Sequence, residues 1–256
     1  MISCFNWFGY ILPLKERIDL IKRAGFDGVM FWWSDEFGNP DYRDNPRLAR
    51  DAGLFVENIH TPFSNVNNLW VDSLEGIAEA DLFLRIVDEC RDYEIPAMVM
   101  HLSQSDPPPY NTLGLDRIKR IIDRAERLGI NVAFENLRDP GSLEFVMNNI
   151  DSQRAGFCFD SGHQNYATPD HDLLRKYGPR LMALHLHDND GTEDQHKLPF
   201  DGTIDWHATM TAIGQLGYTG PVSLESDNTG HEDMPPDSYL RLAHERAKTL
   251  ESMMYP

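Results

Sequence analysis

Four ionisable side chains follow short apolar runs of the sequence and are of the types that bind a divalent metal ion. They are Glu135, Asp160, His185 and Glu225. Because an isolated buried charge is strongly disfavoured, such groups at the ends of apolar strands need a partner, solvent or a cation. An imidazole and three carboxylates without a thiolate suit Mn²⁺, Zn²⁺, Co²⁺ or Mg²⁺. The sequence therefore predicts a divalent-metal site, for which we expect Mn²⁺ or Zn²⁺ before Co²⁺ or Mg²⁺, although it does not by itself choose the metal.

Histidines also follow three of the apolar runs: His60, His101 and His163. A single histidine in such a place is more often a hydrogen-bonded structural residue than a metal ligand. Six predicted strand ends that all carry a histidine or a carboxylate are improbable as coincidence, which favours a metal site. The histidines of predicted loops and helices are expected at the surface: His171, His207, His231 and His244.

The elements that must position these residues alternate along the chain, a short β-type run followed by a longer helix-type run, eight times over. Strands are expected at residues 2–8, 27–33, 55–62, 97–104, 131–137, 156–162, 182–189 and 222–226. Helices are expected at residues 14–24, 46–52, 76–93, 115–128, 142–150, 171–177, 204–216 and 237–253. Gly25 and Gly129 are typical left-handed residues that end a helix before the next strand.

This alternation predicts an α/β fold, a (β/α)₈ TIM barrel formed as a single domain by residues 1–256. In such a barrel the active site lies at the C-terminal ends of the strands and in the loops that follow them. Residues 106–110 and 188–201 are expected to be long loops on that face. An open doubly wound sheet is the alternative, and it is less favoured because no GxGxxG loop follows the first strand.

Aromatic residues of the first two strands are expected to pack the barrel: Phe8, Trp32 and Trp33. Trp7, near the end of the first strand, is the exception, because it is a candidate wall of a ligand pocket.

The composition is that of a soluble globular protein and limits its partners. The 256 residues are 41% hydrophobic and 25% charged, with a net charge of −18 that would repel a polyanion. No stretch approaches the roughly 18 apolar residues of a membrane span, and the first residues lack the features of a signal peptide, so we expect a cytoplasmic protein without a membrane partner. Cys4, Cys90 and Cys158 have no CxxC spacing and are expected to be structural thiols.

The strand-end motifs together resemble the xylose-isomerase-like barrel superfamily. These motifs are His60-Thr61-Pro62, His101, Phe134-Glu135-Asn136, Asp160-Ser161-Gly162-His163, His185-Leu186-His187-Asp188, Asp194-Gln195-His196, Gly202-Thr203-Ile204-Asp205-Trp206 and Glu225. Each motif is short, but their order and spacing cover essentially the whole chain. The superfamily contains sugar and sugar phosphate isomerases and epimerases and, as a distant branch, apurinic-site endonucleases.

The two branches imply different ligand sets. In the isomerase and epimerase branch, the residues matching Glu135, Asp160, His185 and Glu225 bind one divalent ion, and the two glutamates also act as acid and base. In the endonuclease branch a cluster of three zinc ions is bound by the residues that match His60, His101, Glu135, Asp160, His163, His185, Asp194, His196 and Glu225. All nine positions are filled in this chain.

The sequence argues against the endonuclease interpretation. A nuclease that grips duplex DNA needs several basic contacts to phosphate, whereas this chain is strongly acidic. The loop at residues 64–74 has no lysine or arginine, and Val66, Leu69 and Trp70 could line a small-molecule pocket instead. Residues 199–206 are close to a Gly-x-Gly-x-Ile-Asp run of the isomerase branch, except that Phe200 stands where the first glycine would be.

The resemblance implies an isomerase or epimerase of a small sugar or sugar phosphate, with a metal that stabilises an enediolate while Glu135 and Glu225 move the proton. His60, His101, His163, Asp194 and His196 would then bind substrate or a further metal. The alternatives are an apurinic-site endonuclease-like phosphodiesterase and a non-catalytic sugar-binding barrel. No phosphate site is marked, because Arg138 and Lys197 are only single basic candidates. We expect no nucleic-acid partner. The resemblance to the isomerase and epimerase branch implies that the protein can form a homo-oligomer.

Overall fold

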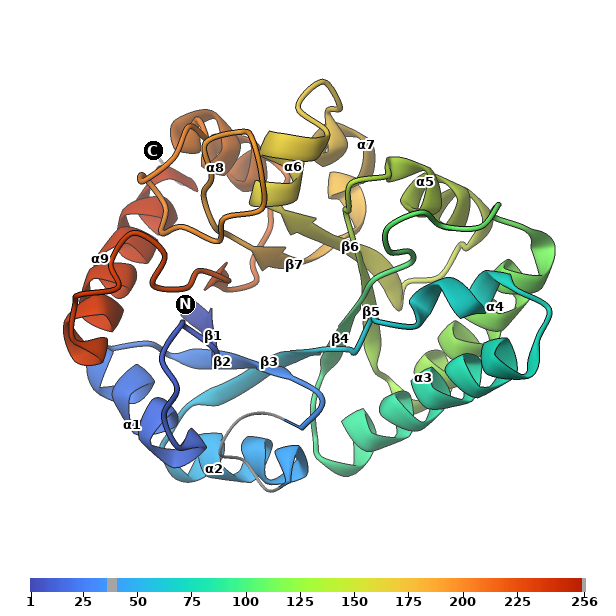
Figure 1. The fold of residues 1–256 in the computed structure, drawn as a ribbon, viewed down its shortest axis with the longest axis horizontal. Helices are drawn as coiled ribbons and strands as arrows, with labels where there is room; N and C mark the ends of the chain where they lie inside the picture. The colour runs from blue at the N-terminus through green and yellow to red at the C-terminus, as the bar shows by residue number, and fades with distance from the viewer. Residues whose placement is uncertain (36–40, 255–256) are drawn as a thin grey trace.

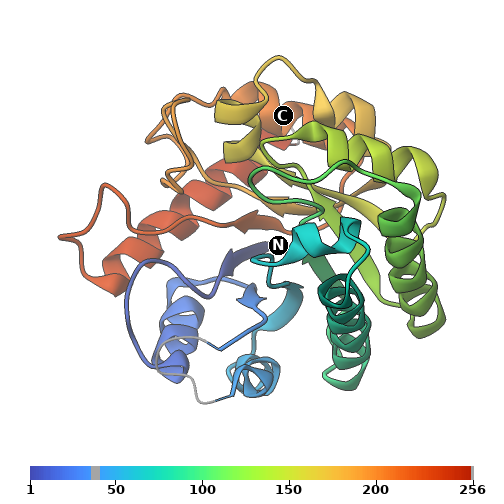
Figure 2. The same cartoon turned by 45° about the vertical axis from the view of Figure 1, so that its right-hand side comes forward.

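Eight parallel strands surrounded by helices form a (β/α)₈ barrel in the computed structural model, which describes residues 1–35 and 41–254. The strands are β1 Ile2–Phe5, β2 Gly28–Trp32, β3 Phe55–His60, β4 Ala97–Met100, β5 Asn131–Glu135, β6 Ala155–Asp160, β7 Leu181–His185 and β8 Val222–Leu224. Figure 1 looks into the ring of strands, and Figure 2 shows the same elements turned. The single-domain TIM barrel predicted from the sequence is confirmed.

The ring closes because the first and last strands pair. β1 pairs in parallel with both β2 and β8, so the strand order ends with β7 on one side and β8 on the other. Between β7 and β8 a parallel bridge joins Leu186 and Leu224, just beyond the end of β7.

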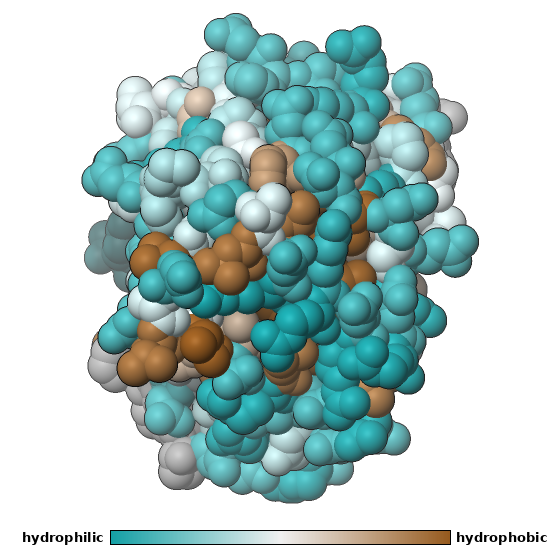
Figure 3. Space-filling model, turned by 90° about the vertical axis from the view of Figure 1, so that its right-hand side faces the viewer, coloured by the Kyte–Doolittle hydropathy of each residue, from teal (hydrophilic) through white to brown (hydrophobic). Residues whose placement is uncertain are grey.

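The helices cover the outside of the barrel (Figure 1). They are α1 Leu14–Ala24, α2 Asn45–Asp51, α3 Leu74–Asp92, α4 Thr112–Leu128, α5 Pro140–Asn149, α6 Ser161–Ala167, α7 Leu173–Tyr177, α8 Trp206–Gln215 and α9 Pro236–Met254. In α4, Ile118, Ile121 and Ile122 are buried while Lys119 and Arg120 are exposed. This amphipathic pattern joins the helix to the barrel and leaves a largely hydrophilic outer surface, which Figure 3 shows for one face.

The structure differs from the sequence prediction at several boundaries. The first predicted strand, at residues 2–8, ends at Phe5, and the last, at residues 222–226, ends at Leu224. The predicted sixth strand ran to residue 162, but the Asp160 side chain accepts a hydrogen bond from the His163 backbone N–H and starts α6, which the sequence analysis missed. A short 3₁₀ helix, Val66–Trp70, occupies what was predicted to be a loop.

Cys4, Cys90 and Cys158 are all buried and free, as expected of structural thiols. Among the helices of the described residues, none is both long and apolar enough to cross a membrane.

Candidate metal centre

The period of two along each strand places the candidate residues on the barrel axis. Four small or branched side chains form a separate cluster inside the barrel: Val99, Ala133, Cys158 and Ala183. Two residues further along the same four strands come His101, Glu135, Asp160 and His185. Since alternate residues of a strand point to the same face, each of these polar side chains lies above a member of the apolar cluster. The barrel interior therefore has an apolar layer, covered at the C-terminal ends of the strands by a layer of polar side chains.

The four residues first singled out in the sequence meet at this place. Glu135, Asp160, His185 and Glu225 can each bring one ligand atom within 4.8 Å of the others. His185 Nδ1 lies 3.2 Å from Glu135 Oε2 and 3.1 Å from Glu225 Oε2. All four side chains are buried. The predicted strand-end set is therefore one spatial cluster.

Three more imidazoles converge on the Glu135 carboxylate. His60 Nε2 and His101 Nε2 lie 3.2 Å and 3.4 Å from Glu135 Oε2, and His163 Nδ1 lies 3.1 Å from Oε1. The ring of His60 is fixed by Nδ1, which lies 2.9 Å from the carbonyl oxygen of Thr61 and donates to it. That bond leaves Nε2 facing Glu135, and a backbone carbonyl orients a metal-binding histidine in the same way.

A second group of residues extends the centre toward the loop after β7. His163 Nε2 lies 3.2 Å from Asp194 Oδ2, and His196 Nε2 lies 3.4 Å from Asp194 Oδ1. His196 Nδ1 lies 2.8 Å from the Glu225 carbonyl oxygen, so this ring too is oriented by the backbone. All nine predicted residues thus belong to one connected cluster.

His187 is a member of the cluster to which the sequence analysis assigned no role. Its Nε2 lies 3.1 Å from Asp160 Oδ2, and its ring stacks on His196 with centroids 4.1 Å apart. The signal was present in the sequence, because His187 follows His185 by two residues. Glu57 was also missed. It is buried in the barrel, where the Ser223 hydroxyl lies 2.8 Å from both of its carboxylate oxygens.

Burial and mutual charge set the protonation of the centre. Burial by itself raises the pKa of Glu135, but the imidazoles of His101 and His185 outweigh it and hold that pKa well below its usual range. Burial also opposes ionisation of Glu225, yet His185 lowers its pKa to about 2. In turn, burial disfavours the charged form of His196, whereas the Asp194 carboxylate raises its pKa to about 10. Without a cation, protons on imidazoles therefore balance the carboxylates.

These residues fit a divalent metal ion. Five buried polar atoms of the cluster have no hydrogen-bond partner among the described residues: Glu135 Oε2, His163 Nδ1, His185 Nδ1, His187 Nδ1 and Asp194 Oδ1. Buried polar atoms are rarely left without a partner because that costs free energy. A cation among oxygen and imidazole donors would satisfy several of them together.

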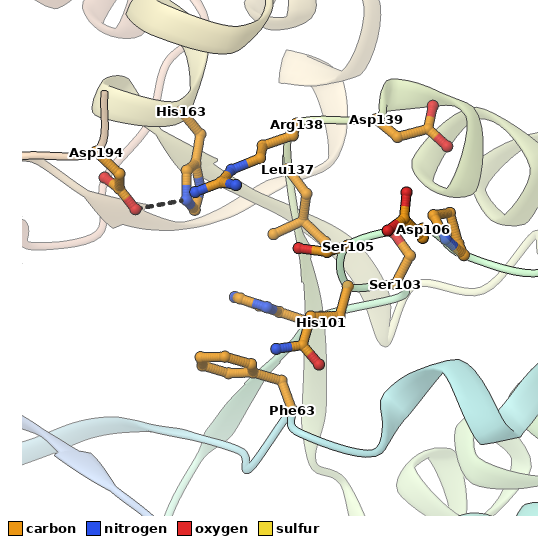
Figure 4. Close-up of a pocket in the computed structure, with 12 residues that line it drawn as sticks. Phe63, His101, Ser103, Ser105, Asp106, Leu137, Arg138, Asp139, His163 and Asp194 are labelled. Carbon is orange, nitrogen blue, oxygen red and sulfur yellow. Dashed lines mark ion pairs between the residues drawn. The ribbon is translucent and has the colours of Figure 1, made fainter. Parts of the chain in front are cut away.

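A pocket of about 460 Å³ opens beside the centre, within the range of about 300–1,000 Å³ typical of small-molecule sites. His101, His163 and Asp194 form part of its wall (Figure 4). Phe63 lines the same side, and its ring stacks on His101 with centroids 4.3 Å apart. The loop after β4 contributes Asp106 to the lining, as expected of a loop on the catalytic face.

Several expectations about the surroundings of the site are wrong. Val66, Leu69 and Trp70 do not line this pocket. They are buried in the hydrophobic core, where the indole N–H of Trp70 donates to the Leu102 carbonyl oxygen at 2.7 Å. Trp7 is also absent from the lining of the pocket, and the guanidinium of Arg17 lies 5.9 Å from its ring centroid.

Other side chains also differ from expectation. Trp32 was expected only to pack the barrel, but its ring stacks on His60 at 5.4 Å, beside the centre. Two histidines expected at the surface are half-buried. His231 Nε2 lies 2.7 Å from Asp201 Oδ2, and the ring of His244 packs edge-on against that of Phe26. The sequence could not reveal these contacts because each joins segments that are distant along the chain or separated by a turn.

Comparison with known proteins places this geometry in context. A family model described as a xylose isomerase-like TIM barrel matches residues 18–250. Inosose isomerase of Bacillus velezensis is 19% identical over 94% of this chain and 93% of its own length. D-psicose 3-epimerase of Agrobacterium fabrum is 22% identical over 86% of this chain and 80% of its own. The crystal structure of IOLI protein with a bound zinc atom covers 100% of this chain and 99% of its own at a TM-score of 0.83 and 17% identity.

Proposed function

The chain belongs to the xylose isomerase-like TIM barrel family, and we propose that it is a divalent-metal-dependent isomerase or epimerase of a small sugar. Related proteins are carbohydrate isomerases and epimerases. The observation that carries the proposal is the pair Glu135 and Glu225, both within 3.2 Å of His185 Nδ1, in a buried centre beside a sugar-sized pocket.

We assign the metal to Glu135, Asp160, His185 and Glu225. A divalent cation bound there supplies Lewis-acid stabilisation of the negative charge that develops on substrate oxygens. Mn²⁺ and Zn²⁺ suit the donors. His187 holds the second oxygen of Asp160, and the backbone N–H of His163 donates to the first at 2.6 Å, so the orientation of this carboxylate is fixed from both sides.

The two glutamates do the proton transfer. Because the pKa of each lies below the ordinary value, each is ionised at neutral pH and can accept the proton from the carbon next to a carbonyl group. Returning that proton to the neighbouring carbon, while the hydroxyl proton passes to the former carbonyl oxygen, gives isomerisation. Inversion at the same carbon requires a proton delivered from the opposite face of the substrate, so the other glutamate, which also rests ionised, must first take up a proton from solvent. His101 and His163, which line the pocket, hold substrate hydroxyl groups against this pair.

The test measures metal content and proton exchange together. We expect about one divalent ion per chain and exchange of a substrate α-proton with solvent deuterium, followed by NMR across a panel of ketoses and aldoses. Glu135→Gln should lower the rate by about 10²–10⁴ while the circular dichroism spectrum is unchanged. Glu16→Gln, on the exposed face of α1, is the matched control and should keep full activity. Full activity of Glu135→Gln would remove this residue from the mechanism.

A second function has one observation in its favour. The group formed by His163, Asp194 and His196 adjoins the first cluster and could hold a further metal ion, as a zinc phosphodiesterase acting on abasic DNA would require. Two or three zinc ions per chain, together with cleavage of an abasic duplex, would favour this function over the isomerase. Binding of sugars without any proton exchange would instead indicate a non-catalytic barrel.

A further inference from the structure

The end of the pocket that is remote from the metal centre is acidic. Asp106 and Asp139 both line the pocket, and Figure 4 shows them on the side opposite His163 and Asp194. Arg138 is the one basic lysine or arginine side chain among the described lining residues, and in Figure 4 it extends toward His163, away from the two aspartates. Its Nε donates to the Tyr166 hydroxyl, and its guanidinium lies 5.6 Å from the centroid of that ring.

At each of the three helices that begin around the pocket, a side chain caps one of the N-terminal N–H groups. At α4 the Asn111 side chain accepts from the Gly114 N–H at 3.0 Å, and at α5 the Asp139 side chain accepts from the Gly141 N–H at 2.8 Å. At α6 the Asp160 side chain takes the N–H that would otherwise be free. At α5 and α6 the capping group is a carboxylate, whose negative charge would repel a phosphate at that helix N-terminus.

Asp106 and Asp139 differ in how strongly they are held. The Asp139 carboxylate receives the Tyr110 hydroxyl at 2.5 Å as well as the backbone of α5. For the exposed Asp106 carboxylate, the described residues provide no hydrogen bond, so it is free to accept one from a ligand. Asp106 also has a φ of 53°, in the left-handed region that aspartate adopts more readily than most residues other than glycine.

We infer that the pocket selects an uncharged polyhydroxy ligand over its phosphorylated form, with Asp106 as the specificity-determining residue at the end remote from the metal. The inference rests on the proposed function for the orientation of the ligand, with its reacting carbons at the metal centre. The carboxylate of Asp106 accepts hydrogen bonds from the distal hydroxyl groups of a free sugar. The same charge repels a phosphate group attached at that end.

Calorimetric titration of the manganese-loaded protein with D-fructose and with D-fructose 6-phosphate tests this inference at fixed ionic strength. These probes differ only at the carbon expected to lie farthest from the metal. We expect the free sugar to bind at least about tenfold more tightly than the phosphate. Asp106→Asn should reduce that ratio several-fold. Asp170→Asn removes the same charge from an exposed position outside this pocket and should leave the ratio unchanged.

Each contrary result has a distinct meaning. Equal or tighter binding of the phosphate overturns the inference, as does failure of both ligands to bind or an unchanged ratio in Asp106→Asn. Binding is measured without turnover, so absence of proton exchange would contradict the proposed isomerase while a preference for the free sugar still supported the pocket's selectivity. Turnover of D-fructose 6-phosphate but not of D-fructose would support the proposed isomerase and contradict the selectivity of the pocket.

Discussion

Replacing Glu57 by glutamine should change how the stability of the protein depends on pH. Glu57 lies inside the barrel on β3, and burial raises its pKa from 4.5 to about 7, although the Ser223 hydroxyl partly offsets the effect. Between these two values the folded protein holds a proton that the unfolded chain releases. The stabilisation from this proton is therefore fully present below pH 4.5 and is lost as the pH rises through 7.

The pKa shift of Glu57 determines how much the free energy of unfolding changes with pH. A shift of about 2.5 pKa units corresponds to about 3.4 kcal/mol in total, of which about 2.5 kcal/mol is lost between pH 5 and pH 8. Glutamine has nearly the shape of a protonated glutamic acid, and its amide oxygen can still accept the Ser223 hydroxyl. It does not titrate, so the stability of Glu57→Gln relative to the unmodified protein should rise by about 2.5 kcal/mol over this interval.

Urea unfolding at pH 5 and pH 8, with a chelator present in every sample, measures this difference. Comparing two proteins at each pH cancels the contributions of all the other titrating groups that they share. Glu16→Gln on the exposed face of α1 is the control and should show no such change. A difference in unfolding free energy between Glu57→Gln and the unmodified protein that is equal at both pH values would refute the reasoning.

Two further predictions concern the metal. His187→Asn removes the ring that holds Asp160 Oδ2 and should weaken metal binding by about 10–100-fold without abolishing folding, as measured by calorimetric titration and circular dichroism. Without metal, burial opposes protonation of His185, but Cys158 and the carboxylates of Glu225 and Glu135 raise its pKa well above the usual range, so the ring carries a proton at neutral pH that a cation must displace. Metal affinity should therefore fall about tenfold per pH unit for each displaced proton as the pH drops from 8 to 6, and an unchanged affinity in competition titrations would contradict this assignment.

The sequence predicted the barrel because the hydrophobic period of about two residues in strands and that of 3.6 residues in helices are both local properties of the chain. Alternation along β5 predicts that Ala133 and Glu135 share a face, and the same reasoning applies to each strand. Since all parallel strands present their C-terminal ends to one side, the strand-end groups had to meet there once the ring closed. The clustering of Glu135, Asp160, His185 and Glu225 followed from the order of the strands alone.

The parts that could not be predicted depend on contacts between distant segments. Glu57 and Ser223 are 166 residues apart and meet only because β1 pairs with β8. Trp70 is buried because the 3₁₀ helix folds back on the strand-four loop, which no local pattern indicates. The start of α6 was missed because one residue, Asp160, both ends a strand and caps the helix, so the pattern of the strand concealed the cap.

The position of Glu57 bears on how negative charge is distributed along the barrel axis. Glu135 and Glu225 both contact His185, and their lowered pKa values keep negative charge at that place. An ionised Glu57 would place a further carboxylate inside the barrel and raise the free energy of the whole interior. Its raised pKa of about 7 means that it is neutral below that pH, so the negative potential is then concentrated at the strand ends, beside the pocket.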